Sequence, residues 1–426
     1  MNIAQLLVRA ARVFPDRIAI TRGFAPHATY RELARRAAAI AHYFTATLRL
    51  QPGDRVALYL PNCPAYLEVL TGIWWAGLTA VPINAKVHTA QLAGILDNAQ
   101  AACCFAAPGG IEASMAAIGE ARSLAITSAR HQQIVQSDRE ASIAWNVPDD
   151  LARRSYTSDA KPKGVMLSHR NLMAMTLCCF ADVDAIGNES CMIHATPLSH
   201  GSGLYGLPHF AAASTQVMPE SSGFDPTEVL ALANHWRNAT LFATPMLIKQ
   251  LVEVARTAQP AIANLKTILY GGPMERPDLL SALSVIGQRF VQIYGRAEST
   301  MTITALSRFH LGDTQNPRYD ARIASVGVPQ SAVEVRIVDR EDRPLPAGQP
   351  GEVLVRGDAV MRGFWMDASA TAAALKGGWL HTGDSGAFDA DGFLTLVRQK
   401  QLDSGGSALY ARRAEDSPGV TTRRGT

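Results

Sequence analysis

Short apolar runs of strand length alternate with helix-patterned segments along most of this chain of 426 residues, and this alternation constrains the fold more than any other feature. The sequence GDRVALYLP at residues 53–61 predicts a strand, AYLEVLTGIWWAG at 65–77 a buried helix, and AACCFA at 101–106 another strand. The same rhythm resumes after residue 155. Because repeated β-α-β alternation favours open, largely parallel sheets with helices on both faces, we expect two similar α/β subdomains.

The pattern changes to a period of two in the last quarter of the chain. There, SAVEVRIVD (331–339) and GEVLVRG (351–357) flank a turn-forming segment, which predicts a smaller antiparallel β subdomain. The predicted fold class is therefore α/β, with similar α/β subdomains at about residues 1–150 and 151–312 and the β subdomain at 313–397.

Composition narrows the class of protein. Apolar residues make up 47% of the chain and charged residues 18%, as in globular enzymes. The net charge of +3 comes without a lysine- or arginine-dense stretch, so we expect no nucleic-acid partner. The N-terminal sequence MNIAQLLVRAARVFPDR has the spacing of an amphipathic helix rather than a signal peptide. No apolar run reaches the roughly 20 residues that span a bilayer.

The six cysteines form no CxxC pair, and several lie in apolar runs. We expect buried, reduced thiols, which suit the cytoplasm, and we place the protein there. The six residues are Cys63, Cys103, Cys104, Cys178, Cys179 and Cys191.

The segment SYTSDAKPKGVMLSHRN at residues 155–171 has the strand, loop and helix order of an anion cradle. Its hydroxyl and backbone N–H groups would face phosphate, and Lys163 would add positive charge. The segment does not match the pattern GxxxxGK[ST], and no GxGxxG follows the early strands, so P-loop hydrolases and Rossmann dehydrogenases are poorly supported. Taken alone, the segment is also explained by an ordinary basic surface loop.

The segment QIYGRAEST at residues 292–300 suggests a metal ligand. A strand end delivers Tyr294, Gly295 permits a tight turn, and Glu298 follows where a carboxylate could bind Mg²⁺, which prefers oxygen ligands. Taken alone, Glu298 also fits a surface glutamate at a helix start.

Three further motifs contain groups that could bind a ligand or line a pocket. Asp384 in WLHTGD follows a glycine turn and could accept hydrogen bonds from a ribose diol. His200 in ATPLSHGSGLYG lies at a glycine-rich strand-to-helix junction suited to the wall of a pocket. YGGPM at residues 270–274 runs a strand into glycines whose backbone a flat ring could approach. Taken alone, the Asp384 segment is better explained as a plain β-turn, and a lone histidine such as His200 is more often structural.

Together and in this order, the five segments resemble the adenylate-forming acyl-CoA synthetases, also called AMP-dependent synthetases and ligases. The resemblance covers nearly the whole chain, from PDRIAI and TYRELARRAA to HTGDSGAFDADGFLTLV. It implies the large N-terminal domain of that fold and a two-step reaction. ATP, with Mg²⁺, converts a carboxylic acid into an acyl-adenylate with release of pyrophosphate, and the thiol of coenzyme A then displaces AMP.

The resemblance also implies roles for single residues. Lys163 would lie near the phosphates, His200 beside the acyl carboxylate, and Glu298 on Mg²⁺. Tyr294 would stack on adenine and Asp384 would hold the ribose. The full set of implied nucleotide contacts is Thr157, Ser158, Gly271, Gly272, Pro273, Tyr294, Gly295, Ala297, Asp384 and, as a weaker ribose candidate, Arg398.

The sequence departs from the family pattern at several points: the usual GGAP is shortened to Gly271-Gly272-Pro273, the hinge at residues 396–406 is about two residues short, and three further departures bear on the reaction. The family loop YTSGTTGxPKG is two residues shorter here and lacks its inner glycines and threonines, with Asp159 in their place. Losing one oxyanion donor typically costs about 10²–10³ in rate. Ala297 replaces a threonine whose hydroxyl helps at the phosphate. The family's C-terminal domain has no lysine-motif match after Gly406, and we expect residues 398–426 to be a disordered remnant of it.

These departures leave alternatives open. The chain is an acid–thiol ligase for a carboxylic acid, with a fatty acid expected and an aromatic acid as the alternative. Or it is a truncated, catalytically impaired member that at most binds a nucleotide or an acyl ligand. A third hypothesis has a separate chain supply the C-terminal domain. A homodimer also stays open.

Overall fold

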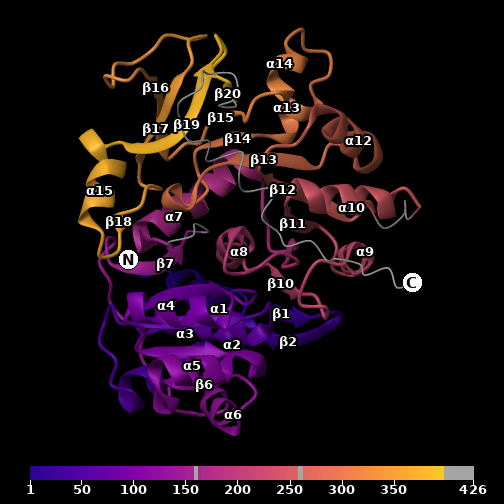
Figure 1. Cartoon of the computed structure of the whole chain (residues 1–426). Coiled ribbons are helices and arrows are strands. Elements are labelled where there is room, and N and C mark those ends of the chain that lie inside the picture. The colour runs from indigo at the N-terminus through magenta and orange to yellow at the C-terminus, as the bar shows by residue number, and fades with distance from the viewer. Residues whose placement is uncertain (158–161, 258–261, 398–426) are drawn as a thin grey trace, which may run out of the picture.

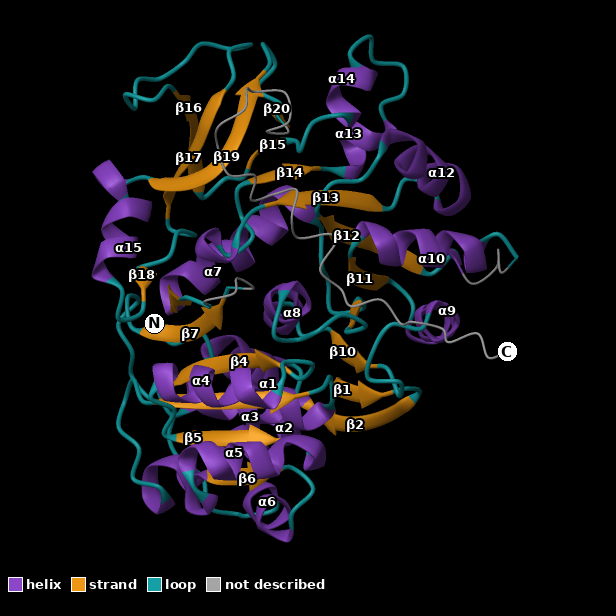
Figure 2. Cartoon of the chain, in the orientation of Figure 1, coloured by secondary structure: helices purple, strands orange, loops and turns teal. Residues whose placement is uncertain are grey.

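The computed structural model describes residues 1–157, 162–257 and 262–397. Within these residues the chain forms two large sheets, A and B, and a small sheet C (Figure 1). Helices cover the large sheets, as Figure 2 shows by colour. The predicted class, two open α/β units with a smaller antiparallel β unit, is confirmed.

Sheet B has seven strands in the order β18-β8-β7-β4-β3-β5-β6. Its central strands are parallel, and β8 and β18 add to one edge antiparallel. The strands are β3 (Arg55–Leu60), β4 (Thr79–Asn84), β5 (Cys103–Ala106), β6 (Ser123–Ala125), β7 (Leu151–Tyr156), β8 (Gly164–Ser168) and β18 (Gly363–Phe364). Central strands such as β3 and β4 are almost wholly buried, because helices cover both faces of a parallel sheet.

Sheet A has nine strands in the order β15-β14-β13-β12-β11-β9-β10-β1-β2. Strands β13 to β1 in this order are parallel, and antiparallel strands close both edges. The strands are β1 (Ile18–Arg22), β2 (Ala25–Thr29), β9 (Cys191–Ile193), β10 (Thr215–Met218), β11 (Ala239–Ala243), β12 (Leu265–Gly271), β13 (Phe290–Tyr294), β14 (Thr304–Leu306) and β15 (Val328–Pro329).

Sheet C is antiparallel throughout, in the order β16-β17-β19-β20. Its strands are β16 (Val333–Val338), β17 (Gly351–Gly357), β19 (Leu380–Phe388) and β20 (Leu394–Leu396). The first two are the strands that the period-two alternation predicts.

Several helices begin at residues whose side chains cap the first turn. Thr29 and Glu32 form a capping box at the start of α2, and Ser168 caps α7. The α-helices are α1 (Gln5–Val13), α2 (Tyr30–His42), α3 (Pro64–Trp75), α4 (Thr89–Ala99), α5 (Ile111–Ile118), α6 (Ala129–Val135), α7 (His169–Cys178), α8 (Gly201–Ala211), α9 (Pro226–Trp236), α10 (Pro245–Ala255), α12 (Arg276–Ile286), α13 (Arg308–Gly312), α14 (Tyr319–Ile323) and α15 (Ala368–Ala374).

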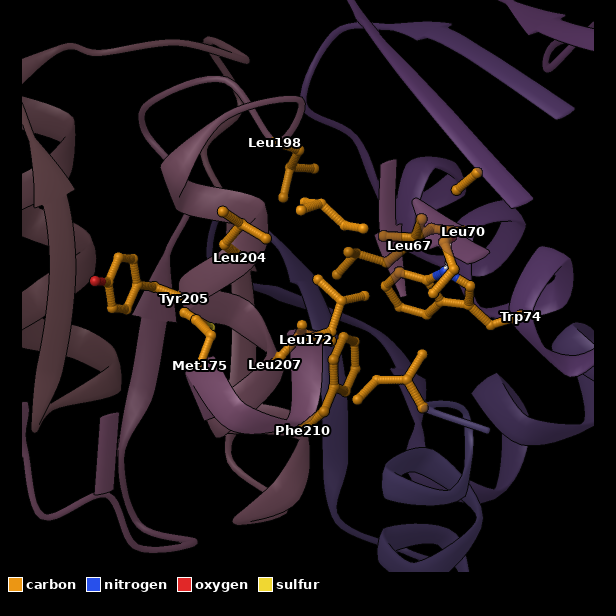
Figure 3. Packing of buried hydrophobic residues seen from close by; sticks show 14 of the residues in the cluster. Leu67, Leu70, Trp74, Leu172, Met175, Leu198, Leu204, Tyr205, Leu207 and Phe210 are labelled. Carbon is orange, nitrogen blue, oxygen red and sulfur yellow. Dashed lines mark hydrogen bonds between the residues drawn. The ribbon is translucent and has the colours of Figure 1, made fainter. Parts of the chain in front are cut away.

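The two large sheets share one apolar core. Figure 3 shows Leu67 and Trp74 of α3 beside Leu172 of α7 and Phe210 of α8. Since α8 follows a strand of sheet A and α3 a strand of sheet B, their contact joins the two sheets.

Sheet membership crosses the sequence boundaries expected near residues 150 and 312. The β1–β2 hairpin joins sheet A, where β1 pairs in parallel with β10. The strands β7 and β8 follow residue 150 but join sheet B. The strands β15 and β18 follow residue 312 but join sheets A and B, respectively. Pairing between distant segments is decided by tertiary burial, which local alternation does not encode.

All six cysteines are buried free thiols, as predicted. Among the described residues, no helix combines the length and apolar character needed to cross a bilayer.

Candidate active site

A cavity of about 320 Å³ lies where the turn after β13, the start of β19, α15 and the two ends of the loop between β7 and β8 meet. Three of the predicted site residues, Thr157, Lys163 and Glu298, line it. The other lining residues are Arg296, Phe364, Ala370, Ala373, Ala374, Leu380, His381 and Thr382.

Asp384 lies beside this cavity and accepts hydrogen bonds from two neighbouring side chains. Tyr294 at the end of β13 donates its hydroxyl proton to Asp384 Oδ2 at 2.9 Å. Arg296 Nη1 donates to the same carboxylate, 3.3 Å from Oδ1 and 3.4 Å from Oδ2. Thr382 fixes the turn, because its Oγ1 accepts from the Asp384 backbone N–H at 3.1 Å. Only 5% of the Asp384 side chain is exposed. Because a buried carboxylate needs partners to offset its lost hydration, these donors are what stabilise its charge.

Arg296 also reaches the second predicted carboxylate. Its Nε lies 3.7 Å from Glu298 Oε2, and Glu298 is buried rather than a surface glutamate. Burial by itself lowers the pKa of Arg296, but Asp384, Glu298 and Tyr294 together outweigh it and raise that pKa. Arg296 is therefore a permanent cation between the two carboxylates. Sequence reasoning missed it, although it sits between Gly295 and Glu298 in the motif.

Gly295 makes the turn after β13 possible. A Cβ atom at this position would lie 2.3 Å from the carbonyl carbon and 2.6 Å from the Cα of Met301. The backbone returns this closely because Thr300 and Met301 adopt left-handed conformations, with φ of 50° and 59°. Only glycine fits here, so the turn that carries Glu298 depends on it.

Replacing Gly295 with alanine is expected to lower the free energy of unfolding by about 1–3 kcal/mol, because backbone must move to admit the methyl group. Gly94 is the matched control. It lies inside α4, and a methyl group added there would meet nothing within 4 Å, so Gly94→Ala should instead stabilise by about 0.5–1 kcal/mol. Denaturant unfolding of both variants checks this. Equal effects of the two substitutions would contradict the role assigned to Gly295.

The two ends of the loop between β7 and β8 are tied together. The Thr157 backbone N–H donates to the Lys163 carbonyl at 3.1 Å, and the Lys163 N–H donates to Thr157 Oγ1 at 3.0 Å. Lys163 is exposed, and its Nζ lies 5.1 Å from the centroid of the Phe364 ring. Ser158, predicted to contact nucleotide, lies outside the described residues, as does Arg398.

The predicted adenine-side residues lie next to Tyr294. Gly271 ends β12 and pairs in register with Ile293 of β13, so Gly272 and Pro273 follow directly beside the Tyr294 strand end. Gly272 has a φ of 97°, which a side chain rarely adopts. Ala297 begins the 3₁₀ turn Ala297–Ser299 that carries Glu298.

His200 caps the start of α8 and is not among the residues that line the cavity. Its Nδ1 is 2.9 Å from Ser199 Oγ. Desolvation by surrounding protein, followed by the positive charge of Arg153, lowers the pKa of His200, so its ring is neutral near pH 7. Glu298 and Lys163 thus line the same cavity, and His200 is not part of that lining.

Arg153 is a second residue that sequence reasoning missed. It is only 2% exposed, donates from Nη2 to the Ser199 carbonyl at 2.5 Å and from Nε to Ser155 Oγ at 2.8 Å. It thereby fixes the turn that presents His200. The sequence of residues 151–156 carries no signal for this burial, because an arginine in a strand is expected at the surface.

The residues fit a magnesium site of modest size. Mg²⁺ is commonly held by one or two carboxylates together with substrate phosphates. Glu298 offers one carboxylate at the cavity wall, and within the described parts of the chain no group of three or more histidine, cysteine or acidic side chains gathers for a metal. Glu298 is the residue that would hold the ion, which would neutralise phosphate charge there.

Comparisons with known proteins find relatives that span most of this chain. A sequence model of the AMP-binding enzyme family matches residues 7–365. Feruloyl-CoA synthase from an Amycolatopsis species is 32% identical over 423 residues, covering 97% of this chain and 83% of that protein. The medium/long-chain-fatty-acid–CoA ligase FadD8 of Mycobacterium tuberculosis is 29% identical over 274 residues, covering 63% of this chain and 46% of that protein.

The fold also has solved counterparts. The N-terminal domain of FACL13 from Mycobacterium tuberculosis superposes with a TM-score of 0.81 at 22% identity, covering 93% of this chain and 99% of that domain. At this identity the likeness shows the fold alone. The family model covers most of the chain, and the chain belongs to the AMP-binding enzyme family, whose relatives here are acyl-CoA ligases.

Proposed function

We propose that this chain activates a carboxylic acid with ATP and passes the acyl group to coenzyme A. The observation that carries the proposal is the cavity wall itself. Thr157, Lys163 and Glu298 face one space of about 320 Å³, and the Tyr294–Asp384 hydrogen bond lies directly beside it. Cationic, hydroxyl and carboxylate groups are the set that a magnesium nucleotide requires.

In the first step a carboxylate oxygen of the acid attacks the α-phosphorus of ATP, and the bond to the pyrophosphate oxygen breaks. Asp384 accepts hydrogen bonds from the ribose hydroxyls, while Lys163 balances charge on the phosphates. Positioning and charge neutralisation dominate such a reaction. In the second step the thiol sulfur of coenzyme A attacks the acyl carbon, and AMP leaves.

The acid is a monocarboxylic acid, and a fatty acid remains the first candidate because residues 200–208 are small and apolar. A specific observation favours an aromatic acid as the second candidate. The relative that covers nearly all of this chain at 32% identity is a feruloyl-CoA synthase.

Acid-dependent release of pyrophosphate from ATP by the purified full chain tests the proposal. A panel of fatty acids of several lengths and of hydroxycinnamic acids identifies the class of acid. Glu298→Gln is expected to lower the rate by about 10²-fold or more, since it removes the metal-binding carboxylate. The control Glu112→Gln changes an exposed glutamate on α5 and should leave the rate unchanged.

Binding of ATP without pyrophosphate release for any acid would contradict the ligase proposal. It would support the alternative of an impaired member that only binds a nucleotide.

A further inference from the structure

A second cavity, of about 350 Å³, shares no lining residue with the cavity at Glu298. It lies between the β1–β2 hairpin of sheet A and the helices α2, α3 and α6, which are together in the lower half of Figure 2. We propose that this cavity is a second ligand site, which binds the phosphate group of a small metabolite. The inference does not depend on the proposed function, because none of its residues takes part in that chemistry.

The wall of this second cavity carries more positive than negative charge. Three arginines, Arg22, Arg35 and Arg36, line it together with a single carboxylate, Glu68. Arg36 donates to Glu68 Oε1, so these two charges are matched. Within the described residues, Arg22 makes no hydrogen bond or ion pair, and Arg35 donates only to two backbone carbonyls at the end of α6, at 3.1 and 3.2 Å. Two guanidinium charges on the wall are therefore not matched by a carboxylate of that wall.

The acidic side chains beside the cavity already have partners. Glu68 is only 3% exposed, and its Oε1 lies 2.8 Å from His27 Nε2 as well as accepting from Arg36. Burial alone raises the pKa of Glu68, but His27 and Arg36 outweigh it and lower that pKa, so the carboxylate stays charged and paired. Glu32 of α2 does not line the cavity, and its carboxylate closes the capping box with Thr29.

A buried polar atom of the same wall lacks a partner. His131 of α6 lines the cavity and is only 4% exposed, and its Nε2 makes no hydrogen bond to any described residue. Buried ring nitrogens are normally hydrogen-bonded, so this one indicates a ligand atom. A phosphate has oxygens that accept and, when singly protonated, a hydroxyl that donates, so it can partner either tautomer of the ring.

The twelve-residue helix α3 begins at this cavity. Its first residues, Pro64 and Ala65, line the wall, and Cys63 before them makes no side-chain hydrogen bond to the helix start. Backbone N–H groups in the first turn of a helix attract phosphate. Burial raises the pKa of the Cys63 thiol to about 11, so the sulfur beside them is uncharged and does not repel an anion.

A phosphate group on a small metabolite fits both the charge and the size of this cavity. A phosphate ester carries about 1.5–2 negative charges at pH 7, and the planar fork of arginine matches its oxygens. Ligand pockets range from about 300 to 1,000 Å³, so this cavity is at the small end of the range and suits a metabolite. Because the wall combines the hairpin of sheet A with helices that follow strands of sheet B, a bound ligand should raise the melting temperature.

Calorimetric titration of the full chain with inorganic phosphate and with glycerol 3-phosphate tests the inference. The wild type should bind both at millimolar concentration. Arg22→Gln should weaken binding by about tenfold or more, because a charge-assisted hydrogen bond is lost. Arg22 is exposed, so this substitution should leave the melting temperature of the free protein unchanged. Equal affinities for the two probes mean that the phosphate alone is recognised, and tighter binding of the ester means that the cavity also holds the organic part.

Two variants are the controls. Arg12→Gln removes an exposed arginine of α1 that does not line the cavity, and Lys163→Gln removes a cation of the other cavity. Both should bind the two probes as the wild type does. Binding that Arg22→Gln leaves within about threefold of the wild type would overturn the inference, whatever Lys163→Gln does. The absence of binding by the wild type at millimolar concentration would also overturn it. Neither result bears on the proposed function.

Discussion

The free energy of unfolding is expected to fall steeply between pH 6.5 and pH 4. Three buried histidines cause this. Burial lowers the pKa of His169 to about 4, of His194 to about 4 and of His209 to about 3, from an ordinary value of 6.5. Between these pH values the three histidines bind protons in the unfolded chain but remain largely neutral in the folded chain. The contribution of these neutral histidines to the free energy of unfolding is fully present above pH 6.5. It is lost as the pH falls toward their pKa values in the folded chain.

The magnitude is large because each pKa unit corresponds to about 1.4 kcal/mol. A shift from 6.5 to about 4 at a wholly buried residue such as His194 amounts to about 3 kcal/mol, a sizeable part of an ordinary folding free energy. Thermal unfolding from pH 7 to pH 5, above the range where most carboxylates titrate, measures it. The melting temperature should drop and unfolding should take up protons.

His169 offers the sharpest variant. Its Nδ1 accepts the Ile3 backbone N–H at 3.0 Å, so protonation there would break the bond. His169→Asn keeps an acceptor without a titrating ring, and its stability should fall less steeply with pH. His42→Asn, at a half-buried position on α2, should keep the wild-type slope. A melting temperature that stays constant from pH 7 to pH 5 would contradict the account.

Asp384→Asn should weaken the binding of AMP by about 10- to 100-fold, because a charged acceptor for the ribose hydroxyls becomes neutral. The shape of the side chain is nearly unchanged, and the amide oxygen can take the place of Asp384 Oδ2 and still accept from Tyr294. Arg296 loses its closest counter-charge, which adds a cost in stability. Titration calorimetry with AMP measures the first effect and thermal unfolding the second.

The control for this substitution is Asp138→Asn, an exposed aspartate that follows α6. It should change neither affinity nor melting temperature. AMP affinity that survives Asp384→Asn unchanged would place the ribose elsewhere. A drop in melting temperature with unchanged affinity would make Asp384 a purely structural partner of Arg296.

The sequence predicts those parts of the fold that local pattern controls. The strands at residues 331–339 and 351–357 follow from period-two alternation, and β3 and α3 follow from a short apolar run and a buried helical segment. Tyr294, Glu298 and Asp384 are predicted as site residues because each lies in a recognisable motif: Tyr294 ends β13, Glu298 follows it, and Asp384 lies within β19. Their assignment to one nucleotide site is a prediction from the order of the motifs along the chain, and local pattern alone does not give it.

The features that the sequence does not predict all depend on contacts between segments that are far apart in the chain. Arg296 and Asp384 are 88 residues apart, and their ion pair forms only because sheet C is placed beside the end of β13. The parallel pairing of β1 with β10 joins residues nearly 200 apart and carries the hairpin into sheet A. Arg153 is hidden from sequence reasoning because an arginine in a strand is expected at the surface rather than buried.

Titration of the full chain with ATP tests the central claim most directly, namely that this cavity is a nucleotide site weakened at the loop after Thr157. The account predicts one site for ATP in the wild type. It also predicts binding at least about tenfold tighter when Gly-Thr-Thr-Gly replaces Asp159-Ala160, since backbone donors for phosphate are restored. Absence of ATP binding in both proteins would contradict it.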